Sequence, residues 1–376
     1  MAEESEARAA PGGGPERQRA LFGAAFLVMA LSRVSPGTAQ VGVQVQPLGP
    51  DIRVGTDSIW EANSTALATS AGVVLIDDFM LRTFTRAFRE RAERDLGRPV
   101  VLVINTHAHD DHTWGNQVFD GVPILAHEAT LREMEARIPQ MASFLARAPG
   151  VLTHLADSLK RAELDASARS ALEQRRQAIA TNLERHADVR ITPPNQVLSA
   201  DATRTIGDTE LRMLALGPAH SPGDLAVFVP SLHLLVVGDL AQARGLSGLD
   251  PQSGSLGGWI LALRRLVALA EREEVEHVVP GHGPTGGPEI LREALAYWSA
   301  LQREVTEART AGPTREQALE RVAMTEYADW TNYGLLHRSN VAAVWDALDR
   351  LPHAGSGLSC VLDTCTGMPW KRMPSS

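Results

Sequence analysis

The sequence contains very little cysteine. Among its 376 residues there are two cysteines, Cys360 and Cys365, both near the C-terminus and far from the histidine-rich segments. A pair five positions apart, with no other ligand type nearby, is a poor zinc site, so we assign it no metal role. In an exported protein the two thiols could form a disulfide that closes a small loop, and the sequence leaves that question open.

An excess of positive charge is also lacking. The formal net charge is −9. An acidic surface argues against a protein that binds the phosphate backbone of nucleic acid, so we expect no nucleic-acid partner. A nuclease is also expected to carry a basic arm or an accessory domain, and the net charge does not support a nuclease. The expected partner is a small-molecule substrate, and the sequence does not indicate the oligomeric state.

Long hydrophobic runs are scarce, and the clearest one lies at the N-terminus. Arg17 and Arg19 precede an apolar run over 20–31, which is shorter than the roughly 20 residues that a transmembrane helix needs. Small residues follow at Gly37, Thr38 and Ala39, as at a signal-peptide cleavage site. We therefore expect 1–39 to be a signal peptide, a periplasmic or secreted mature protein, and no membrane span after cleavage. An uncleaved anchor or a disordered tail is the alternative.

Strand and helix patterns alternate along the rest of the chain. Apolar runs predict strands over 64–69, 72–77, 99–104 and 123–126, and helical spacing predicts a helix over 79–96. Later strands are predicted over 196–198, 203–206, 211–216, 225–229, 234–237 and 278–279, with a helix over 257–273. Strands with helices between them, in two successive halves, predict a layered α/β domain over 40–290.

Two helical regions accompany this domain. The stretch over about 130–190 is rich in Ala, Leu and Arg without strand signals, which predicts a helical insertion of amphipathic helices. The insertion is either a solvated cap without chemistry or a lid that walls a site and selects substrates. Residues 291–376 form the predicted helical C-terminal extension, in which Ser339 or Asn340 is a candidate helix N-cap.

A dense group of metal-ligand residues follows the strand predicted over 99–104. Three histidines and two aspartates fall within 107–112, and imidazole and carboxylate are the ligands that hold catalytic zinc. In an extended loop, residues two apart share a side, so His107, His109 and Asp111 are expected on one face and His112 on another. Asp110 is expected to point away. The number of ligand-type residues exceeds what one open zinc site needs and indicates two metals.

Three later residues stand in comparable places. His220 lies in a loop punctuated by proline and glycine, Asp239 ends an apolar strand, and His282 comes just past a short strand. Each one sits at a junction between a strand and a loop, where α/β architectures place their chemistry. This repeated placement predicts that the three converge on the first cluster.

With these residues the chain resembles the metallo-β-lactamase superfamily. The first motif is H-x-H-x-D-H at His107, His109, Asp111 and His112, and the later ligands follow in the family's order. The opening strands over 63–78 are similar too. The resemblance covers roughly 45–290 and implies an αβ/βα four-layer sandwich with metals at one edge.

The resemblance also implies a role for each residue. His107, His109 and His220 would hold one metal, and Asp111, His112 and His282 the other. Asp239 would bridge both, as in hydroxyacylglutathione hydrolases and other aspartate-bridged members of the family. Asp77 would orient a ligand imidazole; otherwise it is a plain residue at a strand end. The implied cofactors are two Zn²⁺ ions, and the implied catalytic carboxylates are those of Asp111 and Asp239.

The chain departs from typical zinc β-lactamases at several positions. Asp239 stands where a cysteine ligand does in those enzymes, and His112 replaces a serine or cysteine. The lysine that binds the drug's carboxylate in many of them is Gln242 here, although Arg244 could substitute. These departures weaken the β-lactamase interpretation. The chain also resembles periplasmic metallohydrolases associated with quinoprotein and sulfur-oxidation systems.

The favoured function is a zinc hydrolase in which a metal-bridging hydroxide attacks a small acyl substrate: a β-lactam, lactone, ester or thioester. Export disfavours a glutathione thioester. The alternative is an iron-dependent sulfur (persulfide) dioxygenase of the same fold, which uses one iron and a subset of the ligands. Diiron flavoproteins of the fold carry a carboxylate at the position of His109, and this chain does not. No Ser-His-Asp pattern is present either.

Several further residues receive structural interpretations. His127, His233 and His277 are expected to be structural, and Trp114 is expected to be a core or wall residue rather than a substrate platform. His337 is expected to be structural as well, with a role in a pocket as the alternative.

Overall fold

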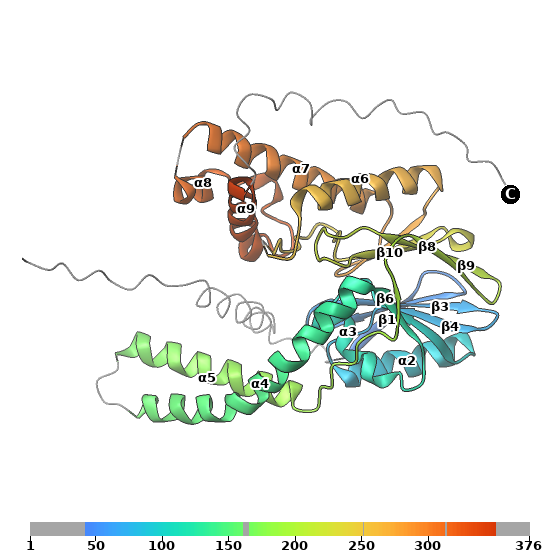
Figure 1. Ribbon diagram of the computed structural model, residues 1–376, viewed down its shortest axis with the longest axis horizontal. Coiled ribbons are helices and arrows are strands. Elements are labelled where there is room, and N and C mark those ends of the chain that lie inside the picture. Colours follow the sequence, from blue (N-terminus) through green and yellow to red (C-terminus); the bar gives the residue numbers. More distant parts are fainter. Residues whose placement is uncertain (1–41, 161–164, 251, 313, 351–376) are drawn as a thin grey trace, which may run out of the picture.

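The computed structural model describes residues 42–160, 165–250, 252–312 and 314–350. They form two facing β-sheets with helices on the outer faces, which confirms the predicted αβ/βα sandwich (Figure 1). The expected signal peptide and both cysteines lie outside the described residues. Within the described ranges, no helix has the length and apolar content to cross a membrane.

The first sheet has seven strands in sequence order, β1 to β7. Its strands are β1 (Val43–Pro47), β2 (Ile52–Asp57), β3 (Asn63–Thr69), β4 (Gly72–Ile76), β5 (Val100–Ile104), β6 (Ile124–His127) and β7 (Gln196–Leu198). The pairings from β1 to β4 are antiparallel and those from β4 to β7 are parallel. Helix α2 (Arg82–Leu96) makes the crossover that the parallel β4–β5 pair requires.

The second sheet has five strands in the order β12-β11-β10-β9-β8. These are β8 (Ala202–Ile206), β9 (Thr209–Ala215), β10 (Leu225–Val229), β11 (Leu234–Gly238) and β12 (His277–Pro280), with the short η2 (Pro230–Leu232) between β10 and β11. Only the β11–β12 pair is parallel among these, and α6 (Leu256–Arg272) connects its strands.

Apolar contacts hold the layers together. Between the sheets, Leu67 and Ile104 of the first sheet belong to one buried cluster with Val227 and Val236 of the second. Helix α2 packs on the outer face of the first sheet, and α6 covers the second sheet. β10 and β11 are buried along their whole length, as expected for strands covered on both faces.

Strand β2 was not predicted. Its sequence, Ile-Arg-Val-Gly-Thr-Asp, contains glycine and aspartate, which obscure a strand pattern. Gly55 is required there because a Cβ would lie 2.6 Å from the Phe88 ring of α2. The helix predicted over 79–96 begins later, at Arg82, because Phe79 is buried in the core beneath α2.

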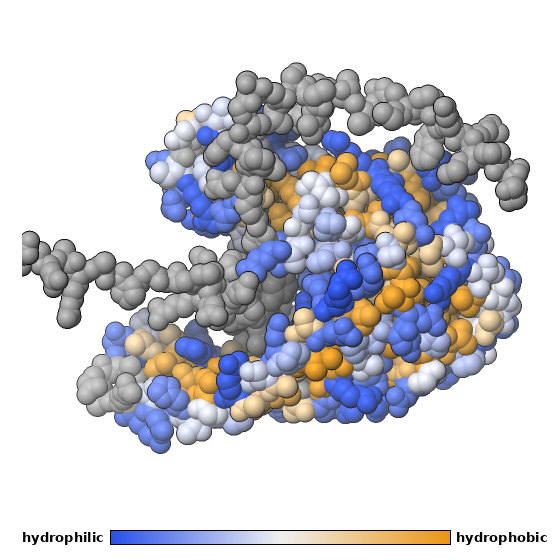
Figure 2. All heavy atoms as spheres, viewed as in Figure 1, coloured by the Kyte–Doolittle hydropathy of each residue, from blue (hydrophilic) through white to orange (hydrophobic). Residues whose placement is uncertain are grey.

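The region predicted as a helical insertion contains α4 (Glu128–Leu159) and α5 (Ala166–His186), which pack against each other. Helix α4 contains Pro139 and Pro149 in its interior and continues through both. The pair projects away from the sandwich (Figure 1). Figure 2 shows hydrophobic side chains on this projection, and Ile138 and Val151 are among its exposed apolar residues.

Further helices lie after β12. They are α7 (Glu289–Thr310), α8 (Arg315–Arg321) and α9 (Tyr333–Arg350), with the short η3 (Thr325–Tyr327) between α8 and α9. Helix α7 packs against α6 and α9. Trp259 of α6 and Trp298 of α7 have ring centroids 4.3 Å apart. The C-terminal helices therefore extend the outer layer over the second sheet (Figure 1).

Candidate metal centre

The seven predicted ligands meet at one edge of the sandwich. The first four follow β5: His107 and His109 lie on the loop, and Asp111 and His112 lie on the short helix α3 (Asp110–Thr113), which is followed by η1 (Trp114–Val118). Asp239 and His282 come directly after β11 and β12, which are adjacent parallel strands. The backbone N–H of Leu225 donates to the carbonyl of Thr106 over 2.7 Å, which joins the His107 and His220 loops. Strand order therefore brings together segments that are far apart in sequence.

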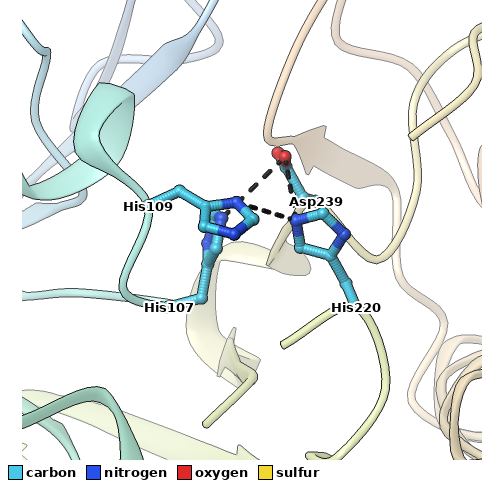
Figure 3. A group of neighbouring side chains, drawn as sticks. All are labelled: His107, His109, His220 and Asp239. Atoms are coloured by element: carbon cyan, nitrogen blue, oxygen red, sulfur yellow. Dashed lines mark hydrogen bonds and ion pairs between the residues drawn. The ribbon is translucent and has the colours of Figure 1, made fainter. Parts of the chain in front are cut away.

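One group consists of His107, His109, His220 and Asp239, each offering a ligand atom within 4.8 Å of the others. The four side chains point toward one another in Figure 3. His220 Nε2 lies 3.0 Å from His109 Nδ1 and 3.4 Å from Asp239 Oδ2. His107 Nε2 lies 3.8 Å from the same carboxylate oxygen.

The second group consists of Asp111, His112 and His282. Their nearest approach is 3.2 Å, between the Nε2 atoms of the two histidines. Asp239 faces this group with its other oxygen, Oδ1, which lies 3.3 Å from His112 Nε2 and 3.4 Å from His282 Nε2. One carboxylate therefore lies between two histidine groups, in the place that a bridging ligand would occupy.

The expectation that Asp111 shares a face with His107 and His109 was wrong. That expectation assumed an extended loop, but the chain turns into α3 at Asp110. The turn carries Asp111 toward His282, whose Nε2 lies 3.4 Å from Asp111 Oδ2. This is the grouping implied by the family resemblance.

Hydrogen bonds orient the imidazoles of His107 and His282, and a buried carboxylate lies beside the imidazole of His112. The Thr106 hydroxyl donates to Asp77 Oδ2 over 2.7 Å, so its oxygen can only accept from His107 Nδ1, 3.0 Å away. His282 Nδ1 donates to the carbonyl of Trp60 over 2.8 Å. His112 Nδ1 lies 3.3 Å from Asp77 Oδ2. In each ring the Nε2 atom is thereby left facing the centre of the site.

Sequence reasoning missed part of this support. Asp77 was a candidate, but Thr106 and Trp60 were not. Trp60 is positioned by Asp57, a buried carboxylate that accepts from the backbone N–H groups of Ile59, Trp60 and Ala62. The position of Thr106 next to His107 was a usable signal. The role of Asp57 depends on how β2 turns into β3, which the sequence pattern did not indicate.

The polar atoms at the centre fit a cation. His107 Nε2 and Asp239 Oδ1 are buried, and neither has a hydrogen-bond partner. Burying such atoms without a partner is costly, and a bound metal ion would satisfy them. Imidazole nitrogens and carboxylate oxygens are also the donor set that zinc accepts. The residues present therefore fit a metal site.

The local electrostatics favour the metal-binding forms of three ligands, His107, His109 and Asp239. Burial, and then the neighbouring imidazoles, hold the pKa values of His107 and His109 well below the usual range, so both rings are neutral. Burial alone would raise the pKa of Asp239, but the charges of His282 and His112 hold it well below its usual range. Neutral imidazole and ionised carboxylate are the ligand states that a metal requires. At His112, His220 and His282 burial opposes protonation, but the neighbouring carboxylates outweigh it and raise the pKa values above the usual 6.5, so these rings must release a proton when they bind a metal.

A chain of hydrogen bonds connects the Asp239 backbone to helix α9. The Ser247 hydroxyl donates to the Asp239 carbonyl over 3.0 Å, and the Asn340 amide donates to the Ser247 carbonyl over 3.0 Å. Asn340 Oδ1 also accepts from Leu249 N. The prediction of Ser339 or Asn340 as a helix N-cap was wrong, because α9 begins at Tyr333 and Asn340 is buried inside it.

Two basic or polar residues near Asp239 do not point into the site. Gln242 is buried and donates to the Ser247 hydroxyl over 3.0 Å. Arg244 forms an exposed ion pair with Asp329. The suggestion that Arg244 replaces the missing lysine therefore finds no support in this arrangement.

The remaining candidates have structural contacts. His127 caps α4, where its Nδ1 accepts from Ala129 N. His337 is buried and lies between the Tyr297 hydroxyl and the Val322 carbonyl, away from the metal-ligand groups. Trp114 is buried in an apolar cluster. Asp110 lies outside both groups and pairs with Arg137. His233 Nδ1 contacts the Glu274 carbonyl, and His277 opens β12.

The fold and the residues of the site define a known class. Residues 59–282 match the model of the metallo-beta-lactamase superfamily. The match covers more than half of the chain, so the chain belongs to this superfamily, as the sequence predicted.

Known proteins of the superfamily match part of the chain. The chain is similar to acyl-coenzyme A thioesterase MBLAC2 of Bos taurus, with 31% identity over 216 residues that cover 56% of this chain and 67% of the relative. It is also similar to metallo-beta-lactamase type 2 of Bacillus sp. (strain 170), with 23% identity and coverage of 62% and 71%. Family and relatives support a hydrolase.

A solved structure supports the fold over a larger part of the chain. A double mutant of the sec-alkyl sulfatase PisA1 matches with a TM-score of 0.59 at 16% identity. The match covers 81% of this chain and 50% of that protein. At this identity the likeness shows the fold alone.

Proposed function

We propose that this chain is a dinuclear zinc hydrolase of small acyl substrates, with thioesters as the leading class. The observation that carries the proposal is the Asp239 carboxylate, whose two oxygens face separate histidine groups at 3.3–3.4 Å. The relative named as an acyl-coenzyme A thioesterase supports the choice of thioesters. β-Lactams, lactones and oxygen esters are the other acyl classes that the same site would accept.

The ligands would hold two metal ions. One ion would be held by His107, His109 and His220, and the other by Asp111, His112 and His282. Asp239 would be a ligand of both ions. Metal ions bound there would supply a hydroxide nucleophile near neutral pH and polarise the acyl carbonyl.

The two carboxylates have the catalytic roles in this proposal. Asp111 is partly exposed, so its carboxylate can orient an attacking water and accept its hydrogen bond. Asp239 is buried and ionised, and it keeps negative charge fixed between the two groups. Asp77 and Thr106 hold the imidazoles in place.

Metal analysis of the purified protein tests the metal assignment. We expect about two zinc ions per chain, with loss of turnover after chelation and recovery with added zinc. One tightly bound iron per chain would overturn the proposal in favour of the iron-dependent persulfide dioxygenase. His107→Ala and Asp239→Ala should abolish turnover and lower zinc content. His154→Gln, at an exposed position on α4, is the matched control and should change neither.

A substrate panel tests the acyl class. It contains acyl thioesters, aliphatic lactones, aryl esters and a chromogenic cephalosporin. We expect the highest kcat/KM with a thioester. A zinc-loaded protein that cleaves the cephalosporin or a lactone much faster than every thioester would contradict the proposed class but not the hydrolytic mechanism.

We also propose that the protein is periplasmic or secreted, on the basis of the leader over 1–39. The N-terminal sequence of protein recovered from fractionated cells tests this proposal. A mature chain that starts near residue 40 in the exported fraction would support it. Full-length protein confined to the cytoplasm would contradict it.

A further inference from the structure

One stripe of α4 lies against the metal loops. Thr130, Met134, Arg137 and Met141 are spaced three or four residues apart, so they share one face of the helix. Thr130 Oγ1 donates to the Gly223 carbonyl over 3.1 Å, which ties this face to the His220 loop. Met134 is buried, and Met141 packs against the same apolar cluster, which includes Ala108 of the His107 loop. The base of the insertion therefore walls the site.

Arg137 is the cation on this stripe. Its Nη1 lies 3.4 Å from Asp110 Oδ1, and the two side chains are 26% and 27% exposed. Asp110 stands between His109 and Asp111 in the chain, so this contact places the guanidinium beside the segment that carries these two ligands.

The Arg137 guanidinium has further N–H donors with which it can bind a ligand. Arginine carries five N–H donors in a planar fork that matches carboxylate and phosphate groups. The contact with Asp110 involves one nitrogen at a long distance. The other two polar candidates are engaged elsewhere, since Gln242 donates to Ser247 and Arg244 pairs with Asp329 at the surface. Arg137 is therefore the best-placed anion receptor that we find among the described residues beside the site.

We propose that Arg137 recognises an anionic group, carboxylate or phosphate, next to the scissile acyl bond of the substrate. This inference rests on the proposed function and adds that the preferred thioesters are negatively charged near the reacting carbon. It also gives the helical insertion a specificity role, because the receptor for the anion comes from α4 and not from the sandwich.

Matched substrates and variants test this inference on the zinc-loaded full-length protein. One pair is the succinyl and butyryl thioesters of a neutral thiol, which differ in charge on the acyl side. Another pair is the butyryl thioesters of 3-mercaptopropionate and of its amide, which differ on the leaving-group side. The variants are Arg137→Met and Arg137→Lys. Arg132→Met is the control on the same helix, because Arg132 is 63% exposed and pairs with Glu128.

We expect Arg137→Met to raise KM for the charged member of at least one pair by about 10- to 100-fold, as for loss of a charge-assisted hydrogen bond. KM for the neutral members should change less than about twofold, since no charge-assisted bond is lost there. Arg137→Lys should recover part of the loss, and Arg132→Met should behave as wild type. The pair that responds identifies which side of the substrate carries the anion.

The experiment distinguishes a failure of the proposed function from a failure of the inference about Arg137. If the wild-type protein cleaves no thioester, the thioester class in the proposed function fails. If it cleaves thioesters but Arg137→Met affects charged and neutral members equally, or neither, the inference about Arg137 is wrong while the proposed function stands. Circular dichroism and zinc content of each variant show whether an equal loss on all substrates arises from misfolding.

Discussion

At the scale of single residues, the site depends on side chains that do not touch its centre. Thr106 is an example, because its hydroxyl connects Asp77 to His107 and sets which nitrogen of that ring carries the proton. Its backbone N–H also donates to Asp77 Oδ1 over 2.7 Å. Removing a hydrogen-bond partner of a ligand histidine typically lowers the metal affinity by about 10- to 100-fold.

We predict that Thr106→Val weakens zinc binding by about 10- to 100-fold while leaving the fold intact. The valine keeps the shape of threonine but can neither accept from His107 nor donate to Asp77. Competition with a chromogenic chelator measures the affinity. Thr69→Val is the matched control, because Thr69 is also buried and its hydroxyl donates to the Gly72 carbonyl in a turn on the first sheet. Equal zinc affinity in the two variants would contradict the role given to Thr106.

At the scale of elements, strand ends and their first loop residues decide how closely the ligands approach. The β12 loop passes so near the β11 loop that a Cβ on Gly281 would lie 1.9 Å from Asp239 Oδ1 and 2.8 Å from the Gly238 backbone. The Gly281 N–H donates to the Gly238 carbonyl over 2.7 Å. Glycine is therefore required at position 281 by the contact between two loops.

We predict that Gly281→Ala displaces Asp239, lowers zinc affinity by at least about tenfold and destabilises the protein by about 1–3 kcal/mol through overpacking. Zinc titration and urea unfolding measure the two effects. Gly257→Ala is the control, since nothing lies within 4 Å of a Cβ at that helical position. A Gly281→Ala protein with wild-type zinc affinity would mean that the β12 loop moves aside freely.

At the scale of the whole molecule, the C-terminal helices and the sandwich share one buried polar network. His337 Nε2 donates to the Val322 carbonyl over 2.8 Å, so its Nδ1 accepts from the Tyr297 hydroxyl, 3.1 Å away. The Asn340 amide lies 3.4 Å from the same hydroxyl and also binds the Ser247 carbonyl. A neutral His337 fits this arrangement, and burial lowers the pKa of that ring below the usual 6.5.

The pH dependence of stability follows from this lowered pKa. A histidine whose pKa is lower in the folded state stabilises the fold above its unfolded pKa, and that contribution is lost as pH falls through the folded pKa. We predict that the free energy of unfolding of His337→Gln is lower than that of wild type at pH 8. The difference should shrink as pH falls below about 6.5. Urea unfolding at several pH values measures it, with the exposed His154→Gln as control. A difference independent of pH would contradict a neutral, buried His337.

The sequence by itself determined the identity of the candidate ligands and most of the strands around them. Each motif is short, contiguous and placed where an apolar strand ends, so local patterns suffice to find it. The same patterns missed β2. Its Gly55 is needed because a Cβ there would clash with the Phe88 ring of α2, which is distant in sequence. The patterns also misplaced Asn340, since helical periodicity does not reveal which loop a buried amide will bind.

The tertiary structure decided how those residues group and what supports them. It moved Asp111 to the His282 side because the chain turns helical at Asp110. It also brought Thr106, Asp57 and Arg137 into relation with the ligands. The contacts of Thr106 with Asp77, of Trp60 with His282 and of Arg137 with Asp110 join segments separated by tens or hundreds of residues, and sheet order and helix packing set their geometry. The sequence therefore indicates which atoms can bind metal, whereas only the fold determines which of them meet and which cation faces the substrate.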